Sequence, residues 1–517
     1  MTETTPSAAA ERRAGRLEGA LGVPSIVFMV IAAAAPITVI GGNVPIAIGS
    51  GNGAGAPAGF VIATVVLLVF AIGFVSMTPY VHEAGAFFSY VTTGLGSRAG
   101  LGTAFVALVA YTAIQVGIYG YFGWALDDIV QYFGGPHVYW GFYALGVLVI
   151  VALLGYRHIE LSSKVLGIAL VLEIAVVVIV DVVIFATGGK EGLAVESFAP
   201  SNVFTPGLGV AVLFALTGFI GFESTAVFRD EARSPERTIP RATYIAVILI
   251  GVVYTASCWA LITGTGASHA VAVAEKTLGG SGNMLPDLAG QYAGPVVQDA
   301  IQVLMCTSLF ACLLSFHNVI ARYQFTLAGK GVFPAALGVI NRRHGSPATS
   351  SLVQTATALV LVGGFAAFRV EPLVGVFGSM AGVATVGMVL LMLTTSIAVL
   401  VFFSRNRTLQ RAQRGRTVIA PILAVIGLAL SLWLVLTNFK LVTGGSTALS
   451  IALALVPVAA LVLGIALGRR YRVGQMAAPN TALLETIRGE AHDEAPAGEL
   501  LGRHPEPSVP ADGDIVQ

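Results

Sequence analysis

The stretch AAAAPITVIGG, residues 32–42, lies in the middle of the first long apolar segment of the chain. Pro36 removes a backbone hydrogen-bond donor and disfavours helix at the residue before it. Gly41 and Gly42 follow, and each glycine inside a helix costs about 1 kcal/mol relative to alanine. These residues predict a broken helix, and the rest of the chain decides what kind of protein would hold such a break.

The composition places the chain in a lipid bilayer. Of its 517 residues, 56% are hydrophobic and 11% are charged, and the mean hydropathy is +0.84. Soluble proteins carry about 25% charged residues, so this chain is too apolar to be covered by water. The net charge of +1 argues against a nucleic-acid partner, which requires a clustered basic face.

Several other classes of protein are excluded by what the sequence lacks. It has no GxxxxGK[ST] motif, no GxSxG motif and no spacing typical of metal ligands, so we expect no enzyme activity, cofactor or metal. The three cysteines lie in apolar segments and cannot form a paired disulfide framework. The first twenty residues lack the apolar core of a signal peptide, which predicts an N-terminus that stays in the cytoplasm.

Apolar runs of about 20 residues predict membrane-spanning helices. We therefore expect an all-α polytopic membrane protein with twelve spans. They are placed near 24–50, 57–77, 101–126, 138–155, 162–187, 207–228, 241–264, 296–325, 348–367, 372–403, 418–439 and 448–468.

The distribution of basic residues supports this count. With a cytoplasmic N-terminus, all but four of the 28 Lys and Arg residues fall on the cytoplasmic side, as the positive-inside rule requires. The four exceptions are Lys190, Lys276, Arg369 and Lys440. One span more or fewer would scramble this distribution.

Two of the spans are interrupted at membrane depth. The first is expected to break at Ala35–Thr38 and again at Gly41–Gly42, and the sixth at Thr217–Gly221. Two such spans, five helices apart, are typical of transporters built from two inverted repeats of five helices, where the freed backbone binds substrate. The alternative is that Gly and Pro are simply common in membrane helices.

Two further stretches carry a family resemblance. GFESTAVFRDEARSPERTIPRATY (221–244) follows the sixth span, and ARYQFTLAGKGVFPAALGVINRRHGSPATS (321–350) ends the eighth. Both resemble the amino acid–polyamine–organocation permeases over roughly residues 22–470. The chain departs from the family pattern at Lys330, where members usually carry Asp. The resemblance implies a LeuT-like fold of twelve helices and the transport of amino acids or amines, often with protons or by exchange.

Composition and the family resemblance together predict a division of the chain. A cytoplasmic tail (1–21) precedes the permease domain (22–470), and a disordered cytoplasmic tail (471–517) follows it. Within the domain we expect repeat one at about 24–190, repeat two at about 205–404, and helices eleven and twelve at 418–468. The segment 78–100 should lie at the inner interface, and 265–295 should form a long outside loop with a short helix.

The substrate is expected between the two breaks. Its carboxylate would meet the amides around Ala35, Ile37 and Thr38, since a half-helix N-terminus favours an anion. Its amino group would meet carbonyls of the sixth span, and Phe219 would close over it. The remaining expected contacts are Gln115, Phe214, Ala215, Thr217 and Gly218. Gln115 belongs to a stripe with Tyr111 and Tyr119, which could equally hold helices together.

Ionisable residues inside a span are functional candidates by default. Glu223 is the first candidate for carrying a proton, although it could instead be a carboxyl that braces the broken helix. Glu173 lies in the fifth span, where some proton-coupled members of the family carry a lysine. His317 could carry a proton or pack against neighbours, and Asp181 is expected at the outer interface.

These features together predict a secondary transporter of the inner membrane. It would move amino acids or related amines by alternating access, as a proton symporter or an exchanger, with the substrate, protons and the lipid bilayer as its partners. The alternative is an uncoupled channel or a nutrient receptor on the same fold.

Overall fold

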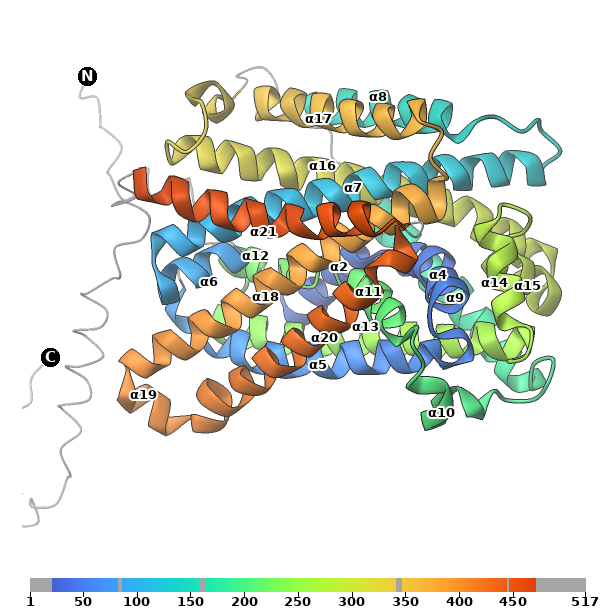
Figure 1. Ribbon diagram of the computed structural model, residues 1–517, viewed down its shortest axis with the longest axis horizontal. Helices are drawn as coiled ribbons and strands as arrows, with labels where there is room; N and C mark the ends of the chain where they lie inside the picture. Colours follow the sequence, from blue (N-terminus) through green and yellow to red (C-terminus); the bar gives the residue numbers. More distant parts are fainter. Residues whose placement is uncertain (1–20, 82–85, 158–162, 341–345, 444–445, 471–517) are drawn as a thin grey trace, which may run out of the picture. The chain divides into compact units, whose positions relative to one another are not determined.

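The structure is a computed structural model that describes residues 21–81, 86–157, 163–340, 346–443 and 446–470 (Figure 1). These ranges are almost entirely helical, and an isolated β-bridge joins Leu21 to Ala232. Apart from Leu21, the two tails expected at 1–21 and 471–517 lie outside the described residues.

The first half of the chain alternates long helices with short ones, where η marks 3₁₀ and π segments. In order they are α2 (Val23–Ala34), α3 (Pro36–Thr38), η1 (Val39–Asn43), α4 (Val44–Ala47), η2 (Ile48–Asn52), η3 (Gly53–Gly55), α5 (Ala56–Ser76), η4 (Thr78–Tyr80), α6 (Ala86–Leu95), α7 (Ser97–Tyr132), α8 (Trp140–Tyr156), α9 (Ser163–Thr187), η5 (Val195–Phe198), α10 (Pro200–Val203), α11 (Leu208–Gly218), α12 (Ser224–Val227) and η6 (Phe228–Glu231).

The second half contains fewer interruptions. Its elements are α13 (Pro235–Thr265), α14 (Ala270–Leu278), α15 (Met284–Ala293), α16 (Pro295–Gly329), η7 (Ala335–Gly338), α17 (Ala348–Ala367), η8 (Pro372–Gly378), α18 (Ser379–Arg405), α19 (Arg407–Ala412), η9 (Gly415–Ile419), α20 (Ala420–Val442) and α21 (Thr447–Arg470).

The long helices confirm a polytopic membrane protein. Within the described residues, nine helical regions are long and apolar enough to cross a membrane. The first of them, Val23–Tyr80, runs for 58 residues and covers two of the expected spans. Two shorter apolar helices, Trp140–Tyr156 and Leu208–Gly218, coincide with two others. The total of twelve spans stays a prediction.

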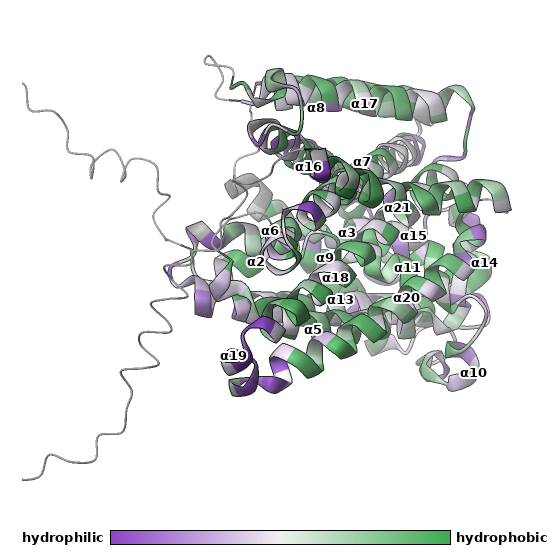
Figure 2. Ribbon diagram, turned by 60° about the vertical axis from the view of Figure 1, so that its left-hand side comes forward, coloured by the Kyte–Doolittle hydropathy of each residue, from purple (hydrophilic) through white to green (hydrophobic). Residues whose placement is uncertain are grey.

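Large apolar side chains point outward from many of these helices, as lipid contact requires. Ile168 of α9, Val252 of α13, Val360 of α17 and Ile426 of α20 are all more than half exposed. In Figure 2, most of the ribbon of α5, α8, α17 and α20 has the colour of hydrophobic residues. A helix of this kind satisfies its own backbone hydrogen bonds, which lipid cannot do.

The first, interrupted helix lies at the centre of the bundle. Its segments α2, α3 and α4 pack against α13, α16, α9 and α11, so residues far apart in the sequence meet around it. The last two helices lie further out, since α20 packs along α5 and α21 along α7. The expected pairing of the two repeats across this centre stays a prediction.

Two connecting segments are more helical than expected. The loop 265–295 holds two short helices, α14 and α15, where one was predicted. The segment 78–100 forms η4, α6 and the start of α7 in its described part. Both segments carry small and polar residues between apolar ones, which weakens the periodic signal that would have revealed them.

Candidate functional site

The first helix breaks at Ala35. This residue has a φ of 45°, in the left-handed region, which costs an L-residue roughly 1–2 kcal/mol. Pro36 follows and has no amide hydrogen to continue the ladder. Backbone strain of this kind persists only where the surrounding structure enforces it, and it clusters at functional sites. The expected interruption at Ala35–Pro36 is therefore present.

The second expected interruption of this helix, at Gly41–Gly42, is wrong. These residues lie in the π segment η1, where the helix widens but continues. The glycines are needed for space: a Cβ on Gly42 would lie 2.6 Å from Cε1 of Tyr121. A Cβ on Gly41 would lie 2.9 Å from the sulfur of Met305. The pair makes room for neighbours and does not free the backbone.

The sixth span breaks after α11. This helix ends at Gly218, and a turn over 219–223 follows it. The amide of Phe219 donates to the carbonyl of Leu216, three residues back, at 3.1 Å. In a regular α-helix it would donate to the carbonyl of Ala215, four residues back. Gly221 has a φ of 113°, which glycine adopts readily and other residues do not.

The two breaks lie against each other. A Cβ on Gly221 would lie 3.3 Å from the Cβ of Ala33, just before the first break. Tyr254 of α13 joins the two: its hydroxyl donates to the carbonyl of Ala34 at 2.9 Å. Its ring meets that of Phe219 edge-on, with 6.0 Å between centroids. Two segments more than 180 positions apart thus form one buried centre.

Protein groups satisfy the donors that were expected to bind a substrate carboxylate. The amide of Thr38 donates to the carbonyl of Ala35 at 3.1 Å, and its hydroxyl donates to Ser308 at 3.3 Å. The backbone of Ile37 lies near enough to the carboxyl of Glu173 to act on it electrostatically. The first break therefore holds a carboxylate of the protein at the place expected for a carboxylate of the substrate.

The expected acceptors on the sixth span also have partners. The carbonyl of Phe214 accepts from the side-chain amide of Asn43 at 2.9 Å, which ties the two broken helices together. The hydroxyls of Thr217 and Thr385 lie 2.5 Å apart. Gly218 is pressed against Tyr254, since a Cβ there would lie 3.1 Å from the tyrosine ring.

Glu173 reaches the first break from α9. Its side chain is buried, and the hydroxyl of Ser308 donates to it at 3.0 Å. Because Thr38 donates to Ser308 in turn, a chain of three polar side chains joins α9 and α16 to the broken helix.

Glu223 closes the second break. The hydroxyl of Tyr111 donates to one carboxyl oxygen at 2.6 Å, and the amide of Gly221 donates to the other at 2.9 Å. The side chain is 3% exposed. Both contacts hold the carboxyl at the turn that follows α11.

His317 has its contacts among other helices. Its Nε2 and the hydroxyl of Ser351 in α17 are 2.8 Å apart. A Cβ on Gly155 of α8 would lie 2.5 Å from the ring. The recorded contacts of His317 therefore join α16 to α8 and α17, and do not include either break.

Tyr111 and Gln115, which share one face of the third span, bond to different parts of the bundle. Tyr111 reaches Glu223, as described above. The side-chain amide of Gln115 donates to the carbonyl of Leu313 at 3.3 Å, and its oxygen accepts from Gln354 at 2.7 Å. Gln115 thus bonds to α16 and α17, in keeping with a residue that holds helices together.

Several residues at this centre were not expected from the sequence. They are Asn43, Tyr254, Ser308 and Thr385. The available signal was a polar side chain inside an apolar helix, but many others share it. Asp181 is buried, and Ser257 of α13 donates to it at 2.5 Å. Its expected position at the outer interface stays a prediction.

The described residues hold no cluster of three or more His, Cys, Asp or Glu side chains suited to a metal ion. The polar groups at the breaks are instead amides, hydroxyls and two carboxyls. This set can bind a small zwitterion or amine through hydrogen bonds and charge, and it can exchange a proton.

Comparison with known proteins indicates a transporter of amino acids over almost the whole chain. The family model described as amino acid permease matches residues 21–464. The chain is 25% identical to an uncharacterised transporter of Mycobacterium tuberculosis, with 77% of this chain and 84% of the relative covered.

Relatives with described substrates are more distant. The serine/threonine exchanger of Bacillus subtilis is 21% identical over 54% of this chain and 62% of its own length. The branched-chain amino acid permease of Lactococcus lactis is 24% identical over 56% of this chain and 64% of its own. The match to the family model spans both broken helices and every helix around them, and the chain therefore belongs to the amino acid permease family.

Proposed function

We propose that this permease moves an amino acid or related amine by alternating access, with the substrate bound between the two breaks. The observation that carries the proposal is the contact between them, bridged by Tyr254 from Ala34 to Phe219. Irregular backbone at membrane depth is tolerated where it is buried in protein or lines a cavity. Transporters of the inverted-repeat class bind their substrates at such helix breaks.

The proposed pose follows from the donors and acceptors at the breaks. The substrate carboxylate replaces Glu173 at the backbone of Ile37, next to the Thr38 amide. Its amino group replaces Asn43 at the carbonyl of Phe214, beside Ala215. In this pose the backbone groups of Ile37 and Phe214 keep a partner, and Glu173 keeps the bond from Ser308. Phe219 closes over the substrate by leaving its contact with Tyr254.

Glu173 is the proposed proton carrier. A substrate carboxylate at Ile37 would lie close to the carboxylate of Glu173, and two such charges a few ångströms apart in a buried site cannot both stay ionised without a large cost. A proton taken up by Glu173 removes the repulsion, so substrate and proton enter together. Glu223 is proposed as the brace of the second break, given its bonds to Tyr111 and Gly221.

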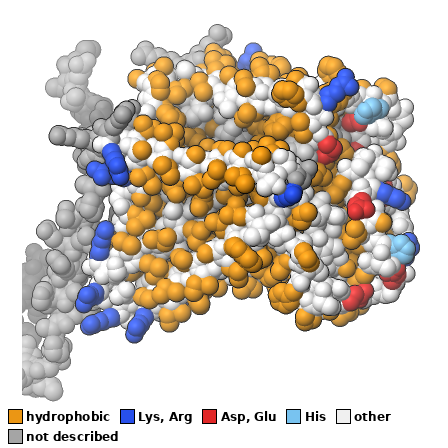
Figure 3. All heavy atoms as spheres, viewed as in Figure 1, with side chains coloured by type: hydrophobic (Ala, Val, Ile, Leu, Met, Phe, Trp, Pro, Cys, Tyr) orange, Lys and Arg blue, Asp and Glu red, His pale blue; other side chains and the backbone are white. Residues whose placement is uncertain are grey.

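We assign the protein to the inner membrane, with both termini in the cytoplasm. The distribution of basic residues supports this orientation. In Figure 3, a cluster of Lys and Arg lies at the left-hand end, the visible Asp, Glu and His lie towards the right-hand end, and the middle is mainly hydrophobic.

Uptake into proteoliposomes tests the function and the coupling. A panel of amino acids and amines, including serine, threonine, branched-chain amino acids, lysine and cadaverine, is offered with an imposed pH gradient. We expect the protein to accumulate at least one of them. Glu173→Gln should lose roughly 5- to 150-fold in accumulation, the usual range of coupling between two ligands, yet still exchange labelled for unlabelled substrate.

Asp181→Asn is the matched control, since it removes a buried carboxyl of the same helix that bonds to Ser257 instead. It should accumulate substrate like the unchanged protein. Full accumulation by Glu173→Gln would move the coupling to Glu223. Equilibration of substrate without accumulation by the unchanged protein would mean an uncoupled channel and would overturn the proposed function.

A further inference from the structure

A cavity of about 500 Å³ lies away from the two breaks, at the end of the molecule where basic residues gather. It is enclosed by the end of α5 with η4, the start of α13, the end of α18, and the segment formed by α19 and η9. On the proposed orientation this is the cytoplasmic end. None of the groups assigned to transport lines it.

Three cations line this cavity. Arg237 and Arg241 are four residues apart on α13, so their side chains lie on one face, one above the other. Arg416 enters from η9 on the other side, near enough to act electrostatically on Tyr244 of α13. Three guanidinium groups from two separate elements therefore converge on one space.

These charges are not neutralised within the described part of the chain. The two ion pairs recorded there join His137 to Asp127 and His269 to Glu191, and neither involves the cavity. Glu236 is the one acid in its lining, and it acts on Tyr80. The cavity thus carries a net positive charge of two, which suits an anion with more than one oxygen.

The rest of the lining suits the interface between water and lipid. Tyr80, Tyr244 and Phe403 contribute aromatic rings, and Tyr80 contacts the ring of Phe403 edge-on at 6.0 Å between centroids. Aromatic residues of this kind gather where a membrane protein meets the headgroups. This lining therefore suits the headgroup region of a bilayer, where phosphate esters lie.

Exposed apolar side chains lie on the helices next to the cavity. Helices α13 and α20 both pack on α5, and each of the three exposes large aliphatic side chains. They are Val61, Val65, Ile245, Ile248, Val252, Ile422, Leu423 and Ile426, with Ile419 at the end of η9. In Figure 2, the polar α19 stands at one end of the hydrophobic α5 and α20. An acyl chain on these side chains would have its headgroup at the arginines.

We propose that this cavity binds the headgroup of an anionic phospholipid, with its acyl chains along α5, α13 and α20. Basic pockets between membrane helices on the cytoplasmic side recognise such headgroups. The phosphate bridges Arg237 and Arg241 on α13 to Arg416 on η9, and so fastens the α19–η9 segment to the helix that follows the second break. The proposal does not depend on the transported substrate or on the proton carrier.

Lipid titration of the purified protein in a neutral detergent tests this site. Phosphatidylglycerol should raise the unfolding temperature and survive as a bound molecule in native mass spectrometry, whereas phosphatidylcholine should do neither. Replacing Arg237, Arg241 and Arg416 together with Gln should weaken the apparent affinity for phosphatidylglycerol roughly 100-fold. Each basic residue near an anionic headgroup contributes roughly fivefold.

The matched control is Arg407→Gln, Arg411→Gln and Arg414→Gln combined. It removes the same charge from the same end, from exposed residues that do not line the cavity. It should keep the affinity of the unchanged protein. Equal losses in the two triple variants would mean attraction to the whole basic end and would overturn the site.

Two further arms identify the ligand. Glycerol 1-phosphate should bind with less than a tenth of the affinity of the lipid, since it lacks acyl chains. An equal affinity would mean that the ligand is a free phosphate compound and would overturn the lipid assignment. Should the triple Gln variant not fold, Arg241→Lys keeps the charge and loses the forked geometry. It should bind phosphatidylglycerol more weakly than the unchanged protein, and unchanged binding would contradict recognition by a built site.

Discussion

Single residues explain why the first helix carries both a proline and a glycine pair. Pro36 follows the left-handed Ala35 and ends one helical segment. Gly41 and Gly42 lie a turn later in a continuous helix, where they admit the ring of Tyr121. Both residue types weaken helix in the same way in a sequence. Their separate reasons, backbone geometry and close approach, become visible only when neighbouring helices are in place.

The glycine pair gives a prediction at this scale. Gly42→Ala would put a Cβ 2.6 Å from Cε1 of Tyr121, and overpacking of a buried site costs about 1–3 kcal/mol. We therefore expect a lower unfolding temperature in detergent. Tyr121→Leu in the same chain should restore much of the loss, since it removes the clashing ring carbon.

Gly146→Ala is the control for this variant. A Cβ there has no heavy atom within 4 Å in the structure, so the change should raise the stability of α8 or leave it unaltered. An equal loss from Gly146→Ala and Gly42→Ala would mean that helix flexibility, and not space for Tyr121, explains the pair.

The buried acids mark the limit of prediction from sequence at the residue scale. Glu173 and Glu223 could be selected because charge inside an apolar helix is costly. Their partners could not, because Ser308 is 135 positions from the one and Tyr111 is 112 from the other. His317 met the same criterion and bonds to Ser351 in another part of the bundle.

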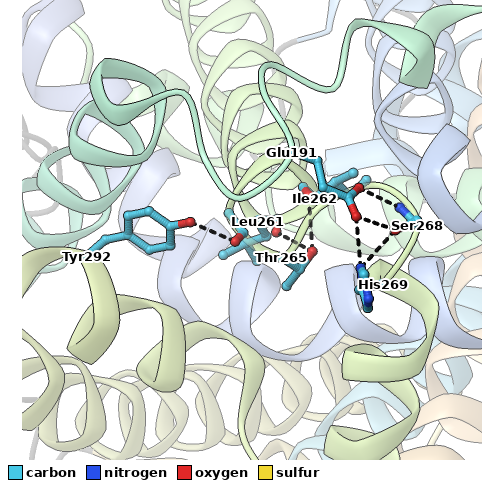
Figure 4. Close-up of polar contacts among 8 residues, drawn as sticks. Glu191, Leu261, Ile262, Thr265, Ser268, His269 and Tyr292 are labelled. Atoms are coloured by element: carbon cyan, nitrogen blue, oxygen red, sulfur yellow. Dashed lines mark hydrogen bonds and ion pairs between the residues drawn. The ribbon is translucent and has the colours of Figure 1, made fainter.

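At the scale of elements, a compact polar group joins the connection after α9 to the start of α14. Figure 4 shows Glu191 beside Ser268 and His269, where the loop after α9 meets the start of α14. The amide of Ser268 donates to Glu191 at 3.1 Å, its hydroxyl donates as well, and Nδ1 of His269 lies 2.9 Å away. These bonds from Ser268 lower the pKa of Glu191 below its ordinary value of 4.5.

The pH dependence of this contact follows from the direction of the pKa shift of Glu191. Because the pKa of Glu191 is lowered in the folded protein, its bonds stabilise the loop at pH values above the ordinary pKa of 4.5. This stabilisation is lost as the pH falls through the lower pKa of the folded state. Hydrogen–deuterium exchange of the Ser268 amide should rise several-fold at pH 7 in Glu191→Gln. The unchanged protein should show the same rise only below about pH 4.5.

Glu196→Gln controls for the loss of charge in this loop. Its recorded contact is through the backbone carbonyl, which accepts from Asn202, so exchange at Ser268 should stay unaltered. An unchanged rate at Ser268 in Glu191→Gln would mean that the backbone of the loop, without the carboxylate, holds this connection.

The sequence predicted elements better where lipid is the solvent. A helix in lipid must be apolar over its whole circumference and about 20 residues long, so regions such as Ser97–Tyr132 and Pro235–Thr265 could be placed. The π segments η1, η2, η8 and η9 could not. Widening a helical turn by one residue depends on packing, and periodicity over so few residues does not record it.

At the scale of the whole molecule, fold class and family follow from features spread along the chain. The apolar spans and the loop motifs were enough to predict an amino acid permease, and the family match over residues 21–464 confirms it. The contacts between the breaks were not predictable, because each joins spans that are adjacent in space and distant in sequence. The orientation of the whole remains a prediction that can be tested directly.

Two cysteines on either side of one helix test this orientation. Ser234 is exposed just before α13, its side chain caps nothing, and Ser281 is exposed between α14 and α15. In a background without Cys258, Cys306 and Cys312, a maleimide that cannot cross membranes should label Ser281→Cys on intact cells. It should label Ser234→Cys only after permeabilisation.

Each other outcome has a definite meaning, because α13 alone separates the two positions among the membrane-spanning candidates. Labelling of both from one side would mean that α13 does not cross the membrane, which its 31 apolar-rich residues argue against. Exchanged labelling would invert the protein and place Arg237, Arg241 and Arg416 in the outer leaflet. The lipid cavity would then face outward, and the basic residues would contradict the positive-inside rule along the whole chain.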